Sequence, residues 1–184
     1  MRNINAISFF EQTHFDPSNV RVNLSGLNIR VLLGLSLSNQ QIAGIAGAPT
    51  GSAISTSLFA QTTMLGSEQV PAGVYFEIKN AQYIRTENVV GIFRESTSAY
   101  GVYIKSVDFI AGGPKGLAAR MIAVIVRQAL AIGNIVRLRL LAAGGRSWDD
   151  LDQPTGERWG GYVAWPTYGF DMNLLPDTLN IIPE

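Results

Sequence analysis

The stretch AGGPKGLAARMIAVIVRQALAIG, residues 111–133, sets the fold of this chain. Apolar residues recur at steps of three and four throughout residues 116–132, and both arginines of that range fall on the other side of the pattern. This spacing predicts an amphipathic helix whose broad apolar stripe packs against a sheet. Pro114 suits the first turn, where its missing N–H costs nothing, and Gly133 suits the position just past the last turn.

Three glycines and a lysine lie directly before or at the start of this helix: Gly112, Gly113, Gly116 and Lys115. The cluster has two interpretations. In the first, the glycines only turn the chain from a strand into the helix. In the second, unpaired backbone N–H groups and the positive end of the helix dipole hold an anion there, and Lys115 adds a mobile charge. The stretch matches neither the P-loop motif nor the glycine motif of dinucleotide sites.

Four segments around the helix are rich in β-branched and aromatic residues, as strands are. They are residues 73–80, 87–95, 99–110 and 134–143. Short polar turns separate the first three, which predicts an antiparallel meander, then the helix, then one further strand. We therefore expect a single α+β (α/β) domain over residues 1–184, with a mixed, mostly antiparallel sheet flanked by helices.

The first third of the chain carries weaker signals. Residues 1–19 are polar and aromatic without clear periodicity, so we expect an irregular segment with at most a short helix ending near Asp16. Residues 20–37 alternate apolar and polar side chains around a glycine, which favours a strand or a hairpin. Ser38 is a good N-cap and predicts a short helix after it, whereas residues 54–65 fit a strand or a helix equally well.

Composition excludes several kinds of chemistry. The chain has no cysteine, which excludes thiolate metal sites and cysteine nucleophiles, and its single histidine, His14, leaves no histidine cluster. We expect His14, in a polar stretch near the N-terminus, to be solvated or to cap a helix. Fourteen basic and fourteen acidic side chains cancel, so no global field attracts nucleic acid or an anionic membrane.

The sequence also bears on location. No apolar run is long enough for a transmembrane helix, and the N-terminus lacks the apolar core of a signal peptide. We expect a cytoplasmic protein with neither a membrane nor nucleic acid as a partner. Export by a route that needs no signal peptide stays open.

The order of these elements, together with two short motifs, resembles the GCN5-related N-acetyltransferase (GNAT) family. That family wraps the pyrophosphate of acetyl-coenzyme A in a turn with the signature Q/R-x-x-G-x-G/A. The matching window here is GPKGLA, residues 113–118. Gly116 and Ala118 take the two small positions, and Gly113 stands where the family has glutamine or arginine.

The second motif lies near the C-terminus, where the family tends to place a tyrosine ahead of a Gly-Phe pair. YGF at residues 168–170 resembles that pair. Trp165 occupies the position of the family's tyrosine, which can act as general acid toward the coenzyme thiolate, so Tyr162 and Tyr168 are the candidates for this role. The resemblance covers residues 73–170, the best-supported GNAT-like core.

The resemblance implies an acyl-coenzyme-A-dependent N-acetyltransferase that acts on a primary amine of a small molecule or a protein. Acetyl-CoA would be its co-substrate, with no metal. Glu77 and Asp108, carboxylates within apolar strands, are the candidate bases for the amine proton. The candidate coenzyme-binding residues run from the strand into the helix: Phe109, Ile110, Gly113, Lys115, Gly116, Leu117 and Ala118.

Two other functions stay open on the residues alone. The same fold can serve as a catalytically inactive interaction protein or a delivered effector. The low share of charged residues, 15% against roughly 25% in average domains, favours partnered surface such as that of a homo-oligomer. Four acidic residues within a short segment could bind a divalent cation in a hydrolase, although an ordinary acidic loop explains them better. They are Asp149, Asp150, Asp152 and Glu157.

Overall fold

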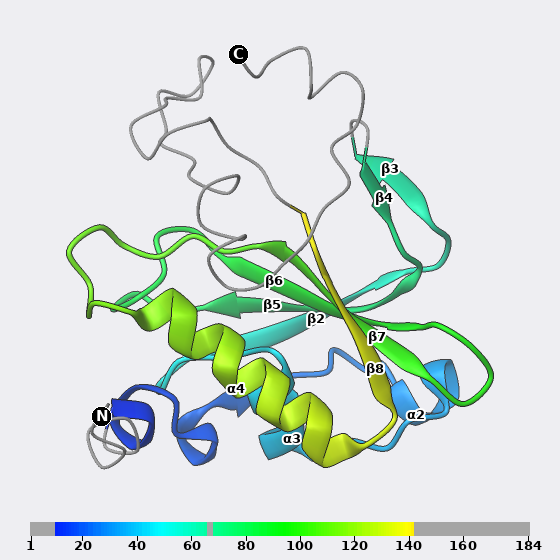
Figure 1. The fold of residues 1–184 in the computed structure, drawn as a ribbon, viewed down its shortest axis with the longest axis horizontal. Helices are drawn as coiled ribbons and strands as arrows, with labels where there is room; N and C mark the ends of the chain where they lie inside the picture. Colours follow the sequence, from blue (N-terminus) through cyan, green and yellow to red (C-terminus); the bar gives the residue numbers. More distant parts are fainter. Residues whose placement is uncertain (1–9, 66–67, 142–184) are drawn as a thin grey trace, which may run out of the picture. The chain divides into compact units, whose positions relative to one another are not determined.

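A six-stranded sheet forms the centre of the described part of the chain, with the strand order β1-β2-β5-β6-β7-β8 (Figure 1). The structure, a computed structural model, describes residues 10–65 and 68–141. By its internal contacts the chain divides into two units, Met1–Leu141 and Ala142–Glu184, and every described residue belongs to the first.

The sheet is mixed and mostly antiparallel. Its strands are β1 (Arg21–Val22), β2 (Ala53–Phe59), β5 (Gly73–Lys79), β6 (Asn88–Arg94), β7 (Tyr100–Ser106) and β8 (Ile135–Leu140). The four strands from β2 to β7 pair antiparallel in chain order, whereas the outer pairs β1–β2 and β7–β8 are parallel. A separate hairpin joins β3 (Thr63–Leu65) to β4 (Glu68–Val70). The α+β fold class and the predicted meander are confirmed.

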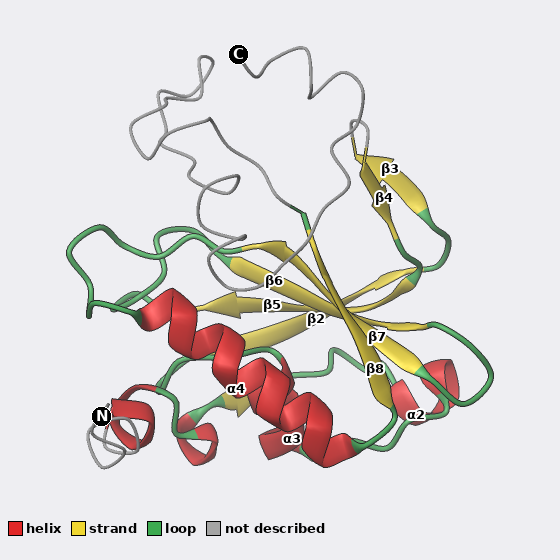
Figure 2. Cartoon of the chain, viewed as in Figure 1, coloured by secondary structure: helices red, strands yellow, loops and turns green. Residues whose placement is uncertain are grey.

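Helix α4 (Leu117–Ile132) connects β7 to β8 and lies across one face of the sheet (Figures 1 and 2). Its buried residues keep the spacing that predicted the helix: Leu117, Met121, Ile122 and Ile125. Helix α3 (Asn39–Ile45) packs so closely against α4 that a Cβ placed on Gly44 would lie 2.7 Å from Oε1 of Gln128. Gly133 ends α4 in the left-handed region with φ 86°, as predicted.

The prediction of a strand or hairpin over residues 20–37 is wrong for most of that range. Only β1 is extended, and helix α2 (Ile29–Leu33) follows it. Asn28 caps α2 by accepting a hydrogen bond from the amide of Val31 (3.1 Å), and Gly34 ends it with φ 76°. The first and last residues of α2 are buried one turn apart. A cap at each end and this buried pair therefore override the alternating pattern.

Two further N-terminal predictions are confirmed, and a stretch left open between strand and helix is resolved. The short helix expected after Ser38 is α3, which begins with a complete capping box between Ser38 and Gln41 (2.9 and 3.2 Å). Residues 10–14 are helical and are followed by the 3-10 turn η1 (Pro17–Asn19), which Asp16 caps. A short helix near Asp16 was expected there. The ambiguous stretch 54–65 is extended in β2 and β3.

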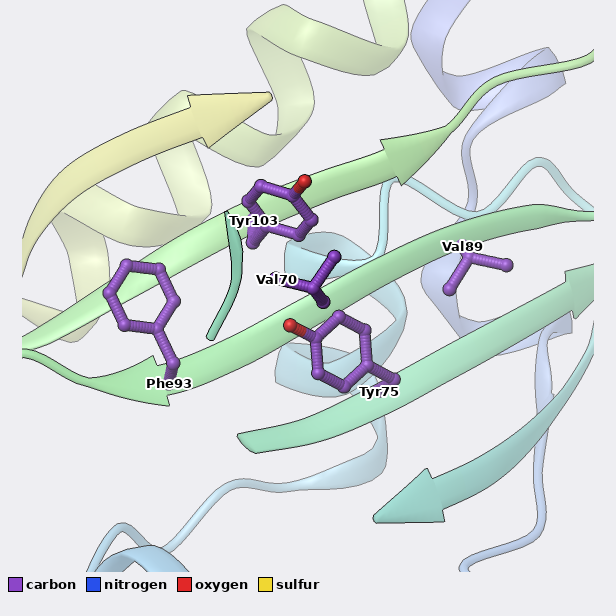
Figure 3. Packing of buried hydrophobic residues seen from close by; sticks show 5 residues of the cluster. All are labelled: Val70, Tyr75, Val89, Phe93 and Tyr103. Atoms are coloured by element: carbon purple, nitrogen blue, oxygen red, sulfur yellow. The ribbon is translucent and has the colours of Figure 1, made fainter. Parts of the chain in front are cut away.

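A cluster of buried aromatic and valine side chains gathers beside β5, β6 and β7 (Figure 3). Its members are Val70, Tyr75, Val89, Phe93 and Tyr103. Two glycines make room for the rings: a Cβ on Gly91 would lie 2.5 Å from the Tyr75 ring, and one on Gly101 would lie 2.2 Å from the Phe93 ring. Each ring therefore lies flat over a neighbouring strand.

Gly101→Ala is expected to destabilise the fold by about 1–3 kcal/mol, because the added methyl overlaps a buried ring that is only 4% exposed. That loss lowers the melting temperature by roughly 2–4 °C per kcal/mol in a chain of this size. Combining it with Phe93→Leu removes the overlap. A double-mutant cycle by thermal unfolding should therefore give a double variant less destabilised than the sum of the two singles. Simple additivity would contradict the close packing of the Phe93 ring over Gly101.

Candidate functional site

The glycine loop before α4 is built from two tight turns. In the first, the amide of Gly113 donates to the carbonyl of Ile110 (3.2 Å), and Gly112 lies inside this turn with φ 84°. In the second, the amide of Leu117 donates to the carbonyl of Pro114 (3.2 Å). Gly116 has φ 85° and ψ 10°, the conformation that a type II turn requires at its third residue and that glycine adopts at the least cost.

No side chain among the described residues caps the N-terminus of helix α4. The shorter elements are capped by Asp16, Asn28 and Ser38, so side-chain capping is this chain's usual solution and α4 departs from it. Within the described residues, four amides at this end have no acceptor. They belong to Lys115, Gly116, Ala118 and Ala119. Lys115 and Gly116 are exposed, Ala118 and Ala119 are half-buried, and all four amides lie at the positive end of the helix dipole.

The predicted coenzyme-binding residues therefore fall into two groups. Phe109, Lys115, Gly116 and Ala118 keep backbone amides without a partner in the described chain. For the other three the backbone amide is already bonded within the protein. Those are Ile110, Gly113 and Leu117. Sequence reasoning missed Ala119, although its position in the first turn of a helix without a polar N-cap is a signal that could have found it.

The chain between β7 and the loop presents a second row of unpaired backbone groups. The β6–β7 register passes from Val90↔Ile104 to Val89↔Ser106, so Lys105 is an extra residue on β7. Beyond it, the carbonyl of Asp108 and the amide of Ile110 bond to residues 83–85, both at 2.9 Å. Backbone groups alternate in direction along extended chain, so those of Val107 and Phe109 point the opposite way. Neither has a hydrogen-bond partner in the described chain.

The two candidate bases differ sharply in their surroundings. Asp108 is held by Arg85 (2.9 Å) and by the hydroxyl of Thr86 (2.7 Å), and its side chain is only 12% exposed. Glu77 is half-buried, and its one recorded partner in the described residues is the hydroxyl of Ser55 (3.3 Å). Glu77 retains lone pairs with which to accept a proton, whereas the Asp108 carboxylate is occupied by structural contacts.

Glu77 also lies in the same cross-strand row as the end of β7. The register places Ser55, Glu77, Val89 and Ser106 side by side on four successive strands. Two strand spacings, about 10 Å, therefore separate the backbone of Glu77 from that of Ser106. The catalytic candidates Tyr162 and Tyr168, like the acidic group Asp149 to Glu157, lie outside the described residues.

Other polar groups serve packing. His14 was expected to be solvated or capping, but its Nδ1 lies 3.0 Å from the hydroxyl of Tyr83, and its ring packs against Phe10 (4.5 Å between centroids). Burial raises the pKa of the Tyr75 phenol, which donates to the carbonyl of Pro71 (2.7 Å). That phenol is fully buried and belongs to the aromatic cluster.

A cavity of about 620 Å³ opens between the N-terminal segment, α3 and α4. Glu11 lines it and pairs with Arg127 (2.6 Å) and Arg120 (3.5 Å). Its α4 residues begin at Val124, seven residues or about 10 Å along the helix from Leu117. The cavity is therefore separate from the glycine loop. No sequence signal predicted it, since its walls are 116 residues apart in the chain.

No protein-family model, curated protein or solved structure matches this chain. In residues 10–65 and 68–141, no helix has the length and apolar character that crossing a bilayer requires. The same residues contain no group of three histidine, aspartate or glutamate side chains placed to hold a metal ion.

Proposed function

We propose that the protein is an acyl-coenzyme-A-dependent N-acyltransferase of the GNAT type, which transfers an acetyl group to a primary amine. One observation carries the proposal: two sets of backbone groups that have no partner in the described part of the chain lie next to each other in sequence. The first is the N-terminus of α4 with Lys115 beside it, and the second is the extended edge at Val107 and Phe109. The crossover from β7 through a glycine loop and α4 to a parallel β8 supports the family resemblance.

These two sets of groups suit the two halves of coenzyme A. The diphosphate is anionic and takes N–H donors and a nearby cation, as the exposed amides and Lys115 offer. The pantetheine arm contains two amides, which pair with extended backbone as a further strand would. Four residues separate Phe109 from Pro114, so one elongated ligand could contact both places.

In the proposed reaction the amine nitrogen attacks the thioester carbonyl, the carbon–sulfur bond breaks, and the coenzyme leaves as a thiolate. The amine must first lose a proton, and Glu77 is the carboxylate available to take it, directly or through a water. Backbone donors near the end of β7 would stabilise the oxyanion that forms on the carbonyl oxygen. As the amide forms, its nitrogen gives up a proton, and the thiolate takes one up to leave as the free thiol. Tyr162 and Tyr168, to which the resemblance assigns the role of acid, lie outside the described residues.

Acetyl-CoA is expected to raise the thermal midpoint of the wild-type protein. At one hundred times its dissociation constant, a ligand that binds only the folded state adds about 2.7 kcal/mol of stability. Titration of acetyl-CoA up to millimolar concentration, followed by thermal unfolding, measures this. Adenosine at the same concentration, which lacks the phosphates and the arm, is the control. No shift at millimolar acetyl-CoA would contradict the proposal and favour a catalytically inactive interaction protein.

A further inference from the structure

Asn88 is a fully buried polar residue at the start of β6, and it contacts two separate elements. Its Oδ1 accepts a hydrogen bond from the amide of Asp108 at 2.6 Å. Its Nδ2 lies 3.8 Å from the sulfur of Met121, in the second turn of α4. A buried amide is costly unless both ends find partners, so its position is fixed from two sides.

The bond to Asp108 falls at a point where the sheet's own pairing is interrupted. Past the extra residue Lys105, the regular β6–β7 ladder ends at the pair Val89↔Ser106. Asn88 supplies from its side chain the acceptor that the ladder does not give to the Asp108 amide. Arg85 and Thr86 hold the carboxylate of the same residue at 2.9 and 2.7 Å.

Together these contacts hold one side of residues 107–110 against residues 83–88. The opposite side, with Val107 and Phe109, is thereby left as an edge without a pairing partner among the described residues. Since Asn88 touches both this segment and Met121, it sets the position of the edge relative to the helix whose N-terminus offers the other donors.

We propose that Asn88 is a positioning residue that holds the two halves of the coenzyme site in register, the edge at Val107 and Phe109 and the N-terminus of α4. This inference rests on the proposed function. It adds that recognition of the pantetheine arm depends on a side chain that does not touch the ligand. The phosphate half of the site, formed by α4 and Lys115, does not depend on Asn88.

Two probes separate the halves: coenzyme A, which carries the arm, and 3′-phospho-ADP, which lacks it. The wild-type protein should bind coenzyme A about 10- to 100-fold more tightly than 3′-phospho-ADP. That ratio corresponds to the free energy of two hydrogen bonds to the pantetheine arm. Asn88→Ala should lower the affinity for coenzyme A to that for 3′-phospho-ADP. Its affinity for 3′-phospho-ADP should stay within twofold of the wild-type value. Asn88→Asp keeps an oxygen for the Asp108 amide but loses the donor to Met121, so it should retain part of the preference for coenzyme A. Isothermal titration calorimetry measures the affinity of each of the three proteins for both probes.

Asn28→Ala is the control for stability. Like Asn88→Ala, it removes an asparagine oxygen that accepts from a backbone amide, but it does so at the cap of α2, remote from the site. It should leave both affinities unchanged. An equal fall for both probes in Asn88→Ala, or no fall, would overturn the positioning role while leaving the proposed function standing. If the wild-type protein bound neither coenzyme A nor 3′-phospho-ADP, both the positioning role and the proposed function would be overturned.

Amide exchange gives a second readout that needs no ligand. The Asp108 amide should exchange slowly in the wild-type protein and in Asn88→Asp, and fast in Asn88→Ala, whereas the amide of Ile110, bonded to Tyr83 (2.9 Å), should stay protected in all three. Protection of Asp108 in Asn88→Ala would show that Asn88 does not hold the segment. Loss of protection at both amides would mean that the variant has lost more than one contact, which also contradicts the proposal.

Discussion

Gly116→Glu is expected to weaken acetyl-CoA binding by about 100-fold or more, because a carboxylate beside the unpaired amides would repel the phosphates. The position is exposed, and a Cβ there meets nothing within 4 Å, so the variant should fold. Its φ of 85° adds a strain of roughly 1–2 kcal/mol for a residue with a side chain. Thermal-shift titration with acetyl-CoA should show the wild-type shift disappear.

Gly133→Glu is the matched control at the other end of the same helix. Gly133 has φ 86°, is exposed, and also leaves a Cβ in open space, so the backbone strain is the same. A carboxylate is stabilised by the helix dipole at the N-terminus and destabilised at the C-terminus by about 0.3–1 kcal/mol, so the control should be the less stable variant. If this variant lost coenzyme binding as completely as Gly116→Glu, the loop would not be the phosphate site.

The elements around α4 could be predicted because their signals are local. The step of three and four residues from Leu117 to Ile132, and β-branched residues in 73–79, 88–94 and 100–106, report directly on which side chains are buried. Helix α2 was missed because five residues are too few to establish a period. There the two caps decide, and both lie outside the helix itself.

The candidate site was only partly predictable, for a related reason. The glycines with positive φ and the start of the helix lie within one short stretch, so the loop could be located from the sequence. The different roles of the Glu77 and Asp108 carboxylates could not be predicted from the sequence. Asp108 meets Arg85 across 23 residues, and Asn88 lies 20 residues from the amide it holds. Such pairings depend on strand register, which a one-residue insertion such as Lys105 shifts without any signal in composition.

Glu77→Gln is expected to lower turnover by about 10²–10⁴-fold, the usual contribution of a general base, while leaving acetyl-CoA affinity unchanged. Glutamine keeps the size and can still accept a hydrogen bond from Ser55, so packing against the neighbouring strands is preserved. Release of the coenzyme thiol measures turnover with a lysine peptide, a polyamine and an amino sugar as acceptors. The residual rate should rise with pH, because more of the acceptor amine is then already deprotonated in solution.

Two variants test whether the loss belongs to Glu77. Glu87→Gln makes the same change in a carboxylate that pairs with Lys79 near the surface (3.8 Å), and it should leave turnover unchanged. Asp108→Asn weakens the pair with Arg85, so it should lower stability and coenzyme affinity more than the rate at saturation. The opposite pattern, in which Asp108→Asn abolishes turnover at full coenzyme occupancy and Glu77→Gln does not, would assign the base to Asp108. Glu77 would then have only a packing role within the cross-strand row from Ser55 to Ser106, because the amine proton would go to Asp108 instead.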